Sequence, residues 1–243
     1  MKRLLVLLFC ISVISVSAQN DFFGNSPISS STGYRDARDI SGKPIPNGAN
    51  SIQGSPLFMD DFVNGVVKFK GNSTNFNLAL GFSLIDNQLY FKKDDATLKF
   101  VNPIDNFSLI VKDENATKVL NFKNGYPSVN SNDEETFYQV VLDGSKVQLL
   151  KFFYKTIHEK YTYGGPVEKE YIAKERLFVY DVASKLMNEI TPNVGSVEKA
   201  LPNYASSIEK FAVNLKVKHE DDLIPLITAL NNEPSKKELK TGK

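Results

Sequence analysis

Between residues 76 and 84, large apolar side chains alternate without a break with small or polar ones. The apolar positions are Phe76, Leu78, Leu80, Phe82 and Leu84. A period of two is typical of a strand with one face in a core and the other in water. The pattern therefore predicts a half-buried β-strand here.

Short polar segments flank this strand and its neighbours, and each predicts a two-residue hairpin loop. The segments are Asn72-Ser73, Asp86-Asn87 and Asp94-Asp95. These loops would set Phe69 opposite Phe76, Leu84 opposite Leu89, and Phe91 opposite Leu98. All large apolar residues then share one face, and a slip of one residue would scatter them. We therefore predict an antiparallel meander.

Two further hairpins follow. Asp143-Gly144 predicts a two-residue loop with Val140 opposite Val147. Since the alternation changes phase at Lys151, we expect a β-bulge between Leu149 and Lys151. From Phe152 to Tyr180 aromatic residues interleave with charged ones around Gly164-Gly165-Pro166, which predicts a long hairpin whose tip projects beyond the sheet.

Helical patterns replace the strand pattern after Thr191-Pro192. Ser196 is a candidate helix cap. Tyr204, Ile208, Phe211 and Leu215 form an apolar stripe at helical spacing. The acids of residues 220–222 favour the start of another helix, with Pro225 tolerated in its first turn.

These patterns predict an α+β protein with a strongly curved antiparallel β-sheet, or a closed barrel, of about eight to ten strands. We place the sheet at residues 57–192. C-terminal helices at 193–231 should pack on it within the same domain, and residues 232–243 should be a disordered tail.

The first residues indicate export. Lys2-Arg3, an apolar run from Leu4 to Val16, and the small residues before Gln19 predict a cleavable signal peptide at 1–18. The chain's single cysteine, Cys10, would be removed with it. Residues 19–56 are rich in Ser, Gly, Asn and Pro, which predicts a flexible arm.

Charge and hydropathy limit the partners. The chain has 29 basic and 28 acidic residues, and loss of Lys2 and Arg3 would keep the two nearly balanced. Nucleic-acid binding needs a basic excess, so we expect none. No later stretch approaches about 18 consecutive apolar residues, so the chain is not expected to span a membrane.

The stretch from Gly54 to Val67 reads Gly-Ser-Pro-Leu-Phe-Met-Asp-Asp-Phe-Val-Asn-Gly-Val-Val, and β-hairpins and a helical tail follow it. In this order it resembles uncharacterised secreted or periplasmic β-rich proteins of Bacteroidota. The Ser-Ala-Gln junction after the apolar run is similar to signal peptides of that phylum. The resemblance implies a place in the periplasm or at the cell surface and transfers no catalytic residue.

Catalytic and metal-binding patterns are sparse. The chain offers two histidines, His158 and His219, for nucleophilic catalysis, and both are interpreted as surface residues. Without cysteine in the mature chain, no zinc site is expected. Acidic clusters such as Asp133-Glu134-Glu135 favour turns, with calcium binding as the alternative. We predict no cofactor, no metal site and no catalytic residue.

The leading functional hypothesis is a non-catalytic interaction subunit of an outer-membrane-associated envelope assembly. Tyr and Arg are enriched at protein interfaces, and the arm and the aromatic-charged hairpin would make the contacts. The candidate partner-binding residues are Phe22, Phe23, Tyr161, Tyr163, Tyr171 and Arg176.

The alternative is a periplasmic carrier that holds a lipid or another apolar ligand inside the curved sheet. Its cavity would be lined by Phe76, Leu80, Phe82, Phe91 and Phe100. An envelope hydrolase is the third hypothesis, because acids are common enough to supply a catalytic pair that sequence cannot single out.

Overall fold

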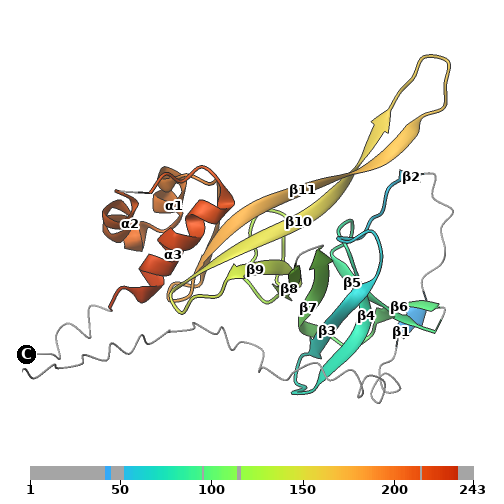
Figure 1. The fold of residues 1–243 in the computed structure, drawn as a ribbon, viewed down its shortest axis with the longest axis horizontal. Helices are drawn as coiled ribbons and strands as arrows, with labels where there is room; N and C mark the ends of the chain where they lie inside the picture. The colour runs from blue at the N-terminus through green and yellow to red at the C-terminus, as the bar shows by residue number, and fades with distance from the viewer. Residues whose placement is uncertain (1–41, 45–51, 95, 114–115, 214, 235–243) are drawn as a thin grey trace, which may run out of the picture. The chain divides into compact units, whose positions relative to one another are not determined.

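The strands of the described protein belong to one sheet whose order largely follows the chain (Figure 1). The computed structural model describes residues 42–44, 52–94, 96–113, 116–213 and 215–234. The strands are β1 Gly42–Pro44, β2 Ile52–Gln53, β3 Val63–Phe69, β4 Asn75–Ser83, β5 Gln88–Lys93, β6 Ala96–Phe100, β7 Ile104–Asp113, β8 Ala116–Lys123, β9 Tyr138–Leu142, β10 Val147–Lys160, β11 Glu168–Asp181 and β12 Leu186–Ile190. The predicted signal peptide and most of the predicted arm lie outside the described residues.

The sheet is curved and open. Its order is β1-β6-β5-β4-β3-β7-β8-β9-β10-β11-β12, and β2 joins β11 separately. Every pairing is antiparallel except that of β2, which runs parallel to β11. Because β1 and β12 do not pair, the described strands form no closed barrel, and that alternative is wrong for them.

Two predicted hairpin registers are wrong by two residues. Val67 lies opposite Phe76, and Phe82 lies opposite Leu89. The shift keeps every side chain on its predicted face, because two residues are one full period of a strand. At the third loop Phe91 lies opposite Leu98, as predicted.

A long-range contact of Asn87 explains the wider loop between β4 and β5. Asn87 adopts a left-handed conformation with φ of 52°. Its side-chain Oδ1 accepts a hydrogen bond from the Phe137 backbone N–H at 2.7 Å. Asparagine tolerates this conformation better than most residues, and the contact fixes it at the end of a four-residue loop.

Asn87→Ala should lower the free energy of unfolding by about 2 kcal/mol, because it removes this hydrogen bond and strains the left-handed backbone. Asn87→Gly removes the same bond without the strain and should cost less. Urea unfolding of both variants measures the two contributions. If both variants lost the same free energy of unfolding, the left-handed backbone at residue 87 would contribute nothing to the difference, and this role would be refuted.

The loop between β9 and β10 is also wider than predicted. Leu142 lies opposite Leu149 and Val140 lies opposite Leu150, so the predicted pairing of Val140 with Val147 is wrong. The predicted bulge is confirmed, since the register shifts between Leu149 and Leu150. Both leucines are fully buried, one on each face of β10.

Aromatic rings pack together on one face of strands β3 to β8. Phe107 stacks on Phe122 with ring centroids 4.8 Å apart, and Phe82 contacts both rings. Phe91 and Phe100 lie 4.5 Å apart. These are contact distances for packed rings. Four of the five residues that the carrier hypothesis assigns to a cavity wall are buried core residues here: Leu80, Phe82, Phe91 and Phe100.

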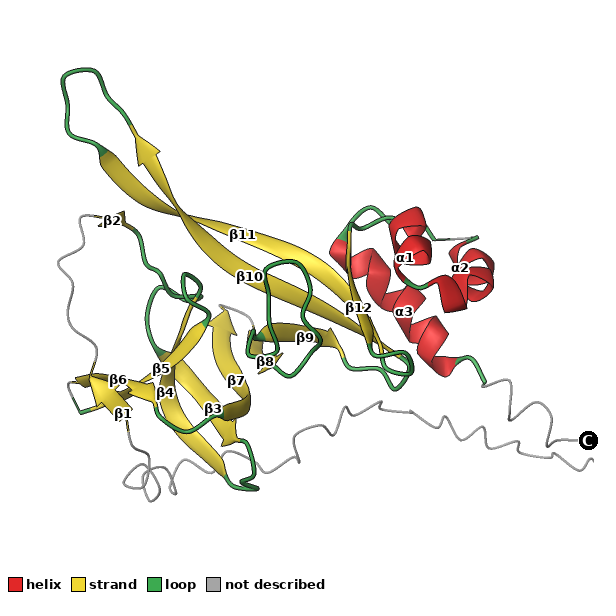
Figure 2. Cartoon of the chain, turned by 180° about the vertical axis from the view of Figure 1, so that it is seen from behind, coloured by secondary structure: helices red, strands yellow, loops and turns green. Residues whose placement is uncertain are grey.

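The helices pack on one face of the last three strands (Figure 2). They are α1 Val194–Ala200, α2 Ala205–Ala212 and α3 Leu223–Asn232, with short 3-10 turns at Pro202–Tyr204 and Glu220–Asp222. Asn193, not Ser196, caps α1, because its side chain accepts from the Ser196 backbone N–H at 2.8 Å. None of the helices in the described residues is long and apolar enough to cross a membrane.

The opposite face of β10 to β12 has its own cluster. Tyr138, Leu150, Phe178 and Met187 are buried there, and Tyr126 from the loop after β8 covers them. Tyr126 donates a hydrogen bond to Gln148 Oε1 at 3.0 Å. The base of the β10–β11 hairpin is thus covered on both faces.

Candidate functional site: the distal hairpin and the pocket at its base

The β10–β11 hairpin extends well beyond the strands that support it. The two strands pair over 14 positions, from Val147 and Asp181 to Lys160 and Glu168. Neighbouring strands cover only part of this length: β9 pairs as far as Lys151, and β12 pairs from Leu177 onward. The long arm drawn between residues 152 and 176 is therefore a two-stranded ribbon over most of its length (Figure 1).

We define the distal hairpin as residues 157–172. Five of the ten large apolar side chains that are exposed in the described residues lie on it. They are Ile157, Tyr161, Tyr163, Val167 and Ile172. Tyr163 is fully exposed, and Tyr161 is 74% exposed. Apolar side chains gathered on a projecting element are typical of an interaction surface.

An ion pair orders the end of the distal hairpin. Lys169 Nζ lies 2.7 Å from Glu159 Oε1 across the two strands. The Tyr161 hydroxyl donates to Glu159 Oε2 at 2.6 Å. Both contacts lower the pKa of the Glu159 carboxyl, with that of Lys169 the larger. The Tyr161 hydroxyl is thus joined to the Glu159–Lys169 ion pair at the start of the tip.

Lys155 fastens the middle of the hairpin to the rest of the sheet. Its ammonium donates to the backbone carbonyls of Ser55 at 2.8 Å and Leu57 at 2.6 Å. Its backbone N–H donates to the Leu84 carbonyl at 3.0 Å. The chain segment between β2 and β3 is thereby held against the hairpin.

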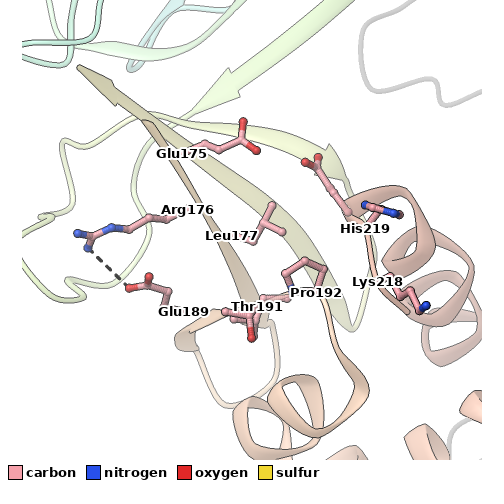
Figure 3. A pocket seen from close by; sticks show the side chains of 10 residues that line it. Glu175, Arg176, Leu177, Glu189, Thr191, Pro192, Lys218 and His219 are labelled. Atoms are coloured by element: carbon pink, nitrogen blue, oxygen red, sulfur yellow. Dashed lines mark ion pairs between the residues drawn. The ribbon is translucent and has the colours of Figure 1, made fainter. Parts of the chain in front are cut away.

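A pocket of about 370 Å³ lies at the base of the free part of β11 (Figure 3). Three segments line it: residues 175–177 of β11, residues 189–192 at the end of β12, and residues 218–220 before α3. Arg176 and Glu189 approach to 3.7 Å at one side. The guanidinium of Arg176 also lies over the Tyr154 ring, 5.3 Å from its centroid.

Lys151 forms ion pairs with two acids on the other side of the pocket. Its ammonium lies 3.5 Å from Glu175 Oε2 and forms a close ion pair with Glu220. Asp222 orders the segment that carries Lys218 and His219, because its carboxylate accepts from both backbone N–H groups at 2.9 Å. These two bonds lower the pKa of the Asp222 carboxyl.

The structure separates the predicted site residues into two groups. Tyr161, Tyr163 and Tyr171 lie on the distal hairpin, with Tyr171 opposite Ile157. Arg176 lies at the base and lines the pocket. Phe22 and Phe23 lie outside the described residues.

The pocket was not predicted from the sequence. Its wall at residues 218–220 comes from a segment between two helices, and no sequence signal indicates that it lies beside β11.

Within the described residues, no group of three or more His, Cys, Asp or Glu side chains could hold a metal ion. Asp133 caps its own turn by accepting from the Glu135 N–H and the Thr136 hydroxyl, both at 3.0 Å.

Comparison of the chain with protein-family models, with curated proteins and with solved structures gives no match. We therefore infer function from the geometry of the distal hairpin and the pocket.

Proposed function

We propose that the protein is a non-catalytic interaction subunit of a cell-envelope assembly and that its distal hairpin contacts the partner. The observation that supports this most is the concentration of exposed apolar side chains at the hairpin end. Export by the predicted signal peptide would bring the chain to the periplasm or cell surface. An outer-membrane protein is the partner class that we propose, and the N-terminal arm is a second contact.

The chemistry of the tip suits a protein partner. Tyrosine combines a large contact area with a hydroxyl that can be hydrogen-bonded, and such residues dominate the binding energy of many interfaces. The Glu159 contacts with Lys169 and Tyr161 order the tip before binding. A surface that is already ordered loses less conformational entropy on association.

The double variant Tyr161→Ser/Tyr163→Ser should lose association while the fold is retained. We expect recovery of the co-purifying envelope protein to fall by about tenfold or more, which corresponds to about 1.4 kcal/mol. The melting temperature should stay unchanged, because both side chains are exposed. The measurement is affinity purification of the tagged protein from gently solubilised native envelopes, with quantitative mass spectrometry.

Leu186→Ser is the matched control, since Leu186 is 59% exposed but lies on β12, away from the distal hairpin. It should leave recovery at the level of the unaltered chain. Undiminished recovery with the double tyrosine variant would refute the proposed role of the tip.

A further inference from the structure

Residues 52–58 connect the two outer edges of the β10–β11 hairpin, and we call this segment the clasp. At its start, β2 pairs with β11 at Lys169 and Glu170. This pairing uses the outer edge of β11, because β10 pairs along the inner edge. Near its end, Leu57 forms an antiparallel bridge with Ser83, the last residue of β4.

The end of the clasp reaches the outer edge of β10 through Leu84. The Leu84 N–H donates to the Pro56 carbonyl at 2.9 Å, and the Leu84 carbonyl accepts from the Lys155 N–H at 3.0 Å. Leu84 lies on the outer side of β10, because β11 occupies the inner side along all 14 positions. The clasp therefore passes from one side of the hairpin to the other.

The clasp crosses the face of the hairpin that carries Phe153 and Lys155. These side chains share a face because they are two residues apart in one strand. Phe58 packs against the Phe153 ring, with centroids 4.9 Å apart. The Lys155 ammonium donates to the carbonyls of Ser55 and Leu57. Two charge-assisted hydrogen bonds thus fasten the middle of the clasp to the strand that it crosses.

The two ends of the clasp are held unequally. Phe58 is anchored in the aromatic cluster: its ring contacts Phe122 at 5.5 Å between centroids, and its N–H donates to the Phe82 carbonyl at 2.7 Å. At the other end, β2 pairs at two positions. Such a short edge pairing belongs to the low-stability end of a structure. The bonds of Lys155 lie between the anchored end and this weaker one.

The middle of the hairpin depends on the clasp for lateral contact. β9 pairs with β10 as far as Lys151, and β12 pairs with β11 from Leu177 onward. Nearer the tip, β2 is the strand of the described chain that pairs with the hairpin. Because an isolated two-stranded hairpin is marginally stable in water, this contact matters for the order of the distal hairpin.

We propose that the clasp fixes the direction of the distal hairpin and that Lys155 is the positioning residue that holds the clasp on it. With the clasp in place, the tip tyrosines face the partner in one direction, and association loses less conformational entropy. For the free protein this inference stands on the contacts alone. For the effect on binding it rests on the proposed function.

Lys155→Met tests the clasp, because methionine keeps an apolar stem and removes the ammonium. Spin labels on Lys160→Cys in the hairpin and Lys112→Cys on β7 report the distance between hairpin and sheet; both positions are exposed. Cys10→Ser in the full-length chain leaves these two cysteines alone to react. Double electron–electron resonance should give a broader distance distribution with Lys155→Met than with lysine. Lys174→Met removes the same charge from the other face of the hairpin and should leave the distribution unchanged.

Gly54→Val tests the clasp without altering the hairpin. Gly54 has φ of 87°, which a β-branched residue strongly disfavours, and a Cβ there would meet no atom within 4 Å. The substitution therefore acts on the backbone conformation and should also broaden the distribution. Gly71→Val is its control, because Gly71 has φ of 75° and equally open surroundings but lies in the turn before β4.

Hydrogen exchange measures the opening of the clasp itself. In Lys155→Met, the amides of residues 52–57 should exchange about tenfold or more faster, because a hydrogen bond from a charged group is lost at each of two carbonyls. Exchange in β7 and β8 should stay as in the unaltered chain. Circular dichroism of each variant confirms folding before these measurements.

The outcomes separate this inference from the proposed function. Unchanged distance distributions in both clasp variants would overturn it, whatever happens to the partner. If both distributions broaden, recovery of the envelope partner should fall about threefold or more, and undiminished recovery would overturn the positioning role. If the double tyrosine variant kept its partner, the proposed tip contact would fail, while broader distributions would still support the clasp.

Discussion

Phe107→Ala is expected to lower the free energy of unfolding by about 3–5 kcal/mol, the range for removal of a buried phenylalanine. Phe107 is fully buried and contacts Phe82 at 5.1 Å, Phe122 at 4.8 Å and Phe137 at 5.1 Å between ring centroids. Its truncation removes all of these contacts and leaves a cavity that the stiff strands around it cannot fill. Urea unfolding followed by circular dichroism measures the loss.

Val119→Ala is the control, because Val119 lies on the adjacent strand β8 but is 55% exposed. It should change the free energy of unfolding by no more than about 0.5 kcal/mol. If Phe107→Ala cost as little, the ring would not be packed, and the hollow sheet of the carrier hypothesis would have to be reconsidered.

Asn231→Ala is expected to lower the free energy of unfolding by about 2–4 kcal/mol. The Asn231 side chain joins α3 to the start of β10 by accepting from the N–H groups of Lys146 at 2.8 Å and Val147 at 3.1 Å. It also donates to the Val147 carbonyl and to the Ile227 carbonyl, both at 2.9 Å. Alanine leaves these groups without partners, and a buried unpaired N–H costs about 1–3 kcal/mol.

An alanine substitution at Asn232, the next residue of α3, is the control for helix propensity. Asn232 is exposed, and Asn232→Ala should be nearly neutral. Chemical denaturation of both variants gives the comparison. A similar effect at the two positions would show that the side-chain bonds of Asn231 do not hold the helix on the sheet.

The sequence predicted which residues face the core, but not all of the loops that connect them. The alternation of Phe76, Leu78, Leu80 and Phe82 fixes the face of β4 whatever the register. The loop lengths depend on contacts from distant parts of the chain. Asn87 bonds to Phe137, and Asn231 bonds to Lys146, so local turn propensities could not reveal either wide loop.

Only part of the candidate site could be predicted from the sequence, because the rest depends on contacts between distant segments. The long hairpin with Tyr161 and Tyr163 exposed follows from local signals: an aromatic-charged run around a Gly-Gly-Pro turn. The pocket and the pairing of β2 arise only in the assembled sheet, where β12 ends at Ile190 and β2 pairs in parallel with β11. A strand that ends beside a longer neighbour leaves no pattern in the sequence. A parallel pairing of only two residues leaves none either.

Strand β10 is the shared wall of two separate cores, because successive residues of a strand point to opposite faces. Leu149 belongs to the cluster under the helices, and Leu150 belongs to the cluster under Tyr126. Departure of the helices would expose one side of a strand whose other side is still packed. Loss of either cluster would therefore expose a face of β10, and we expect the unfolding of the helices and of the aromatic loop to be coupled through this strand.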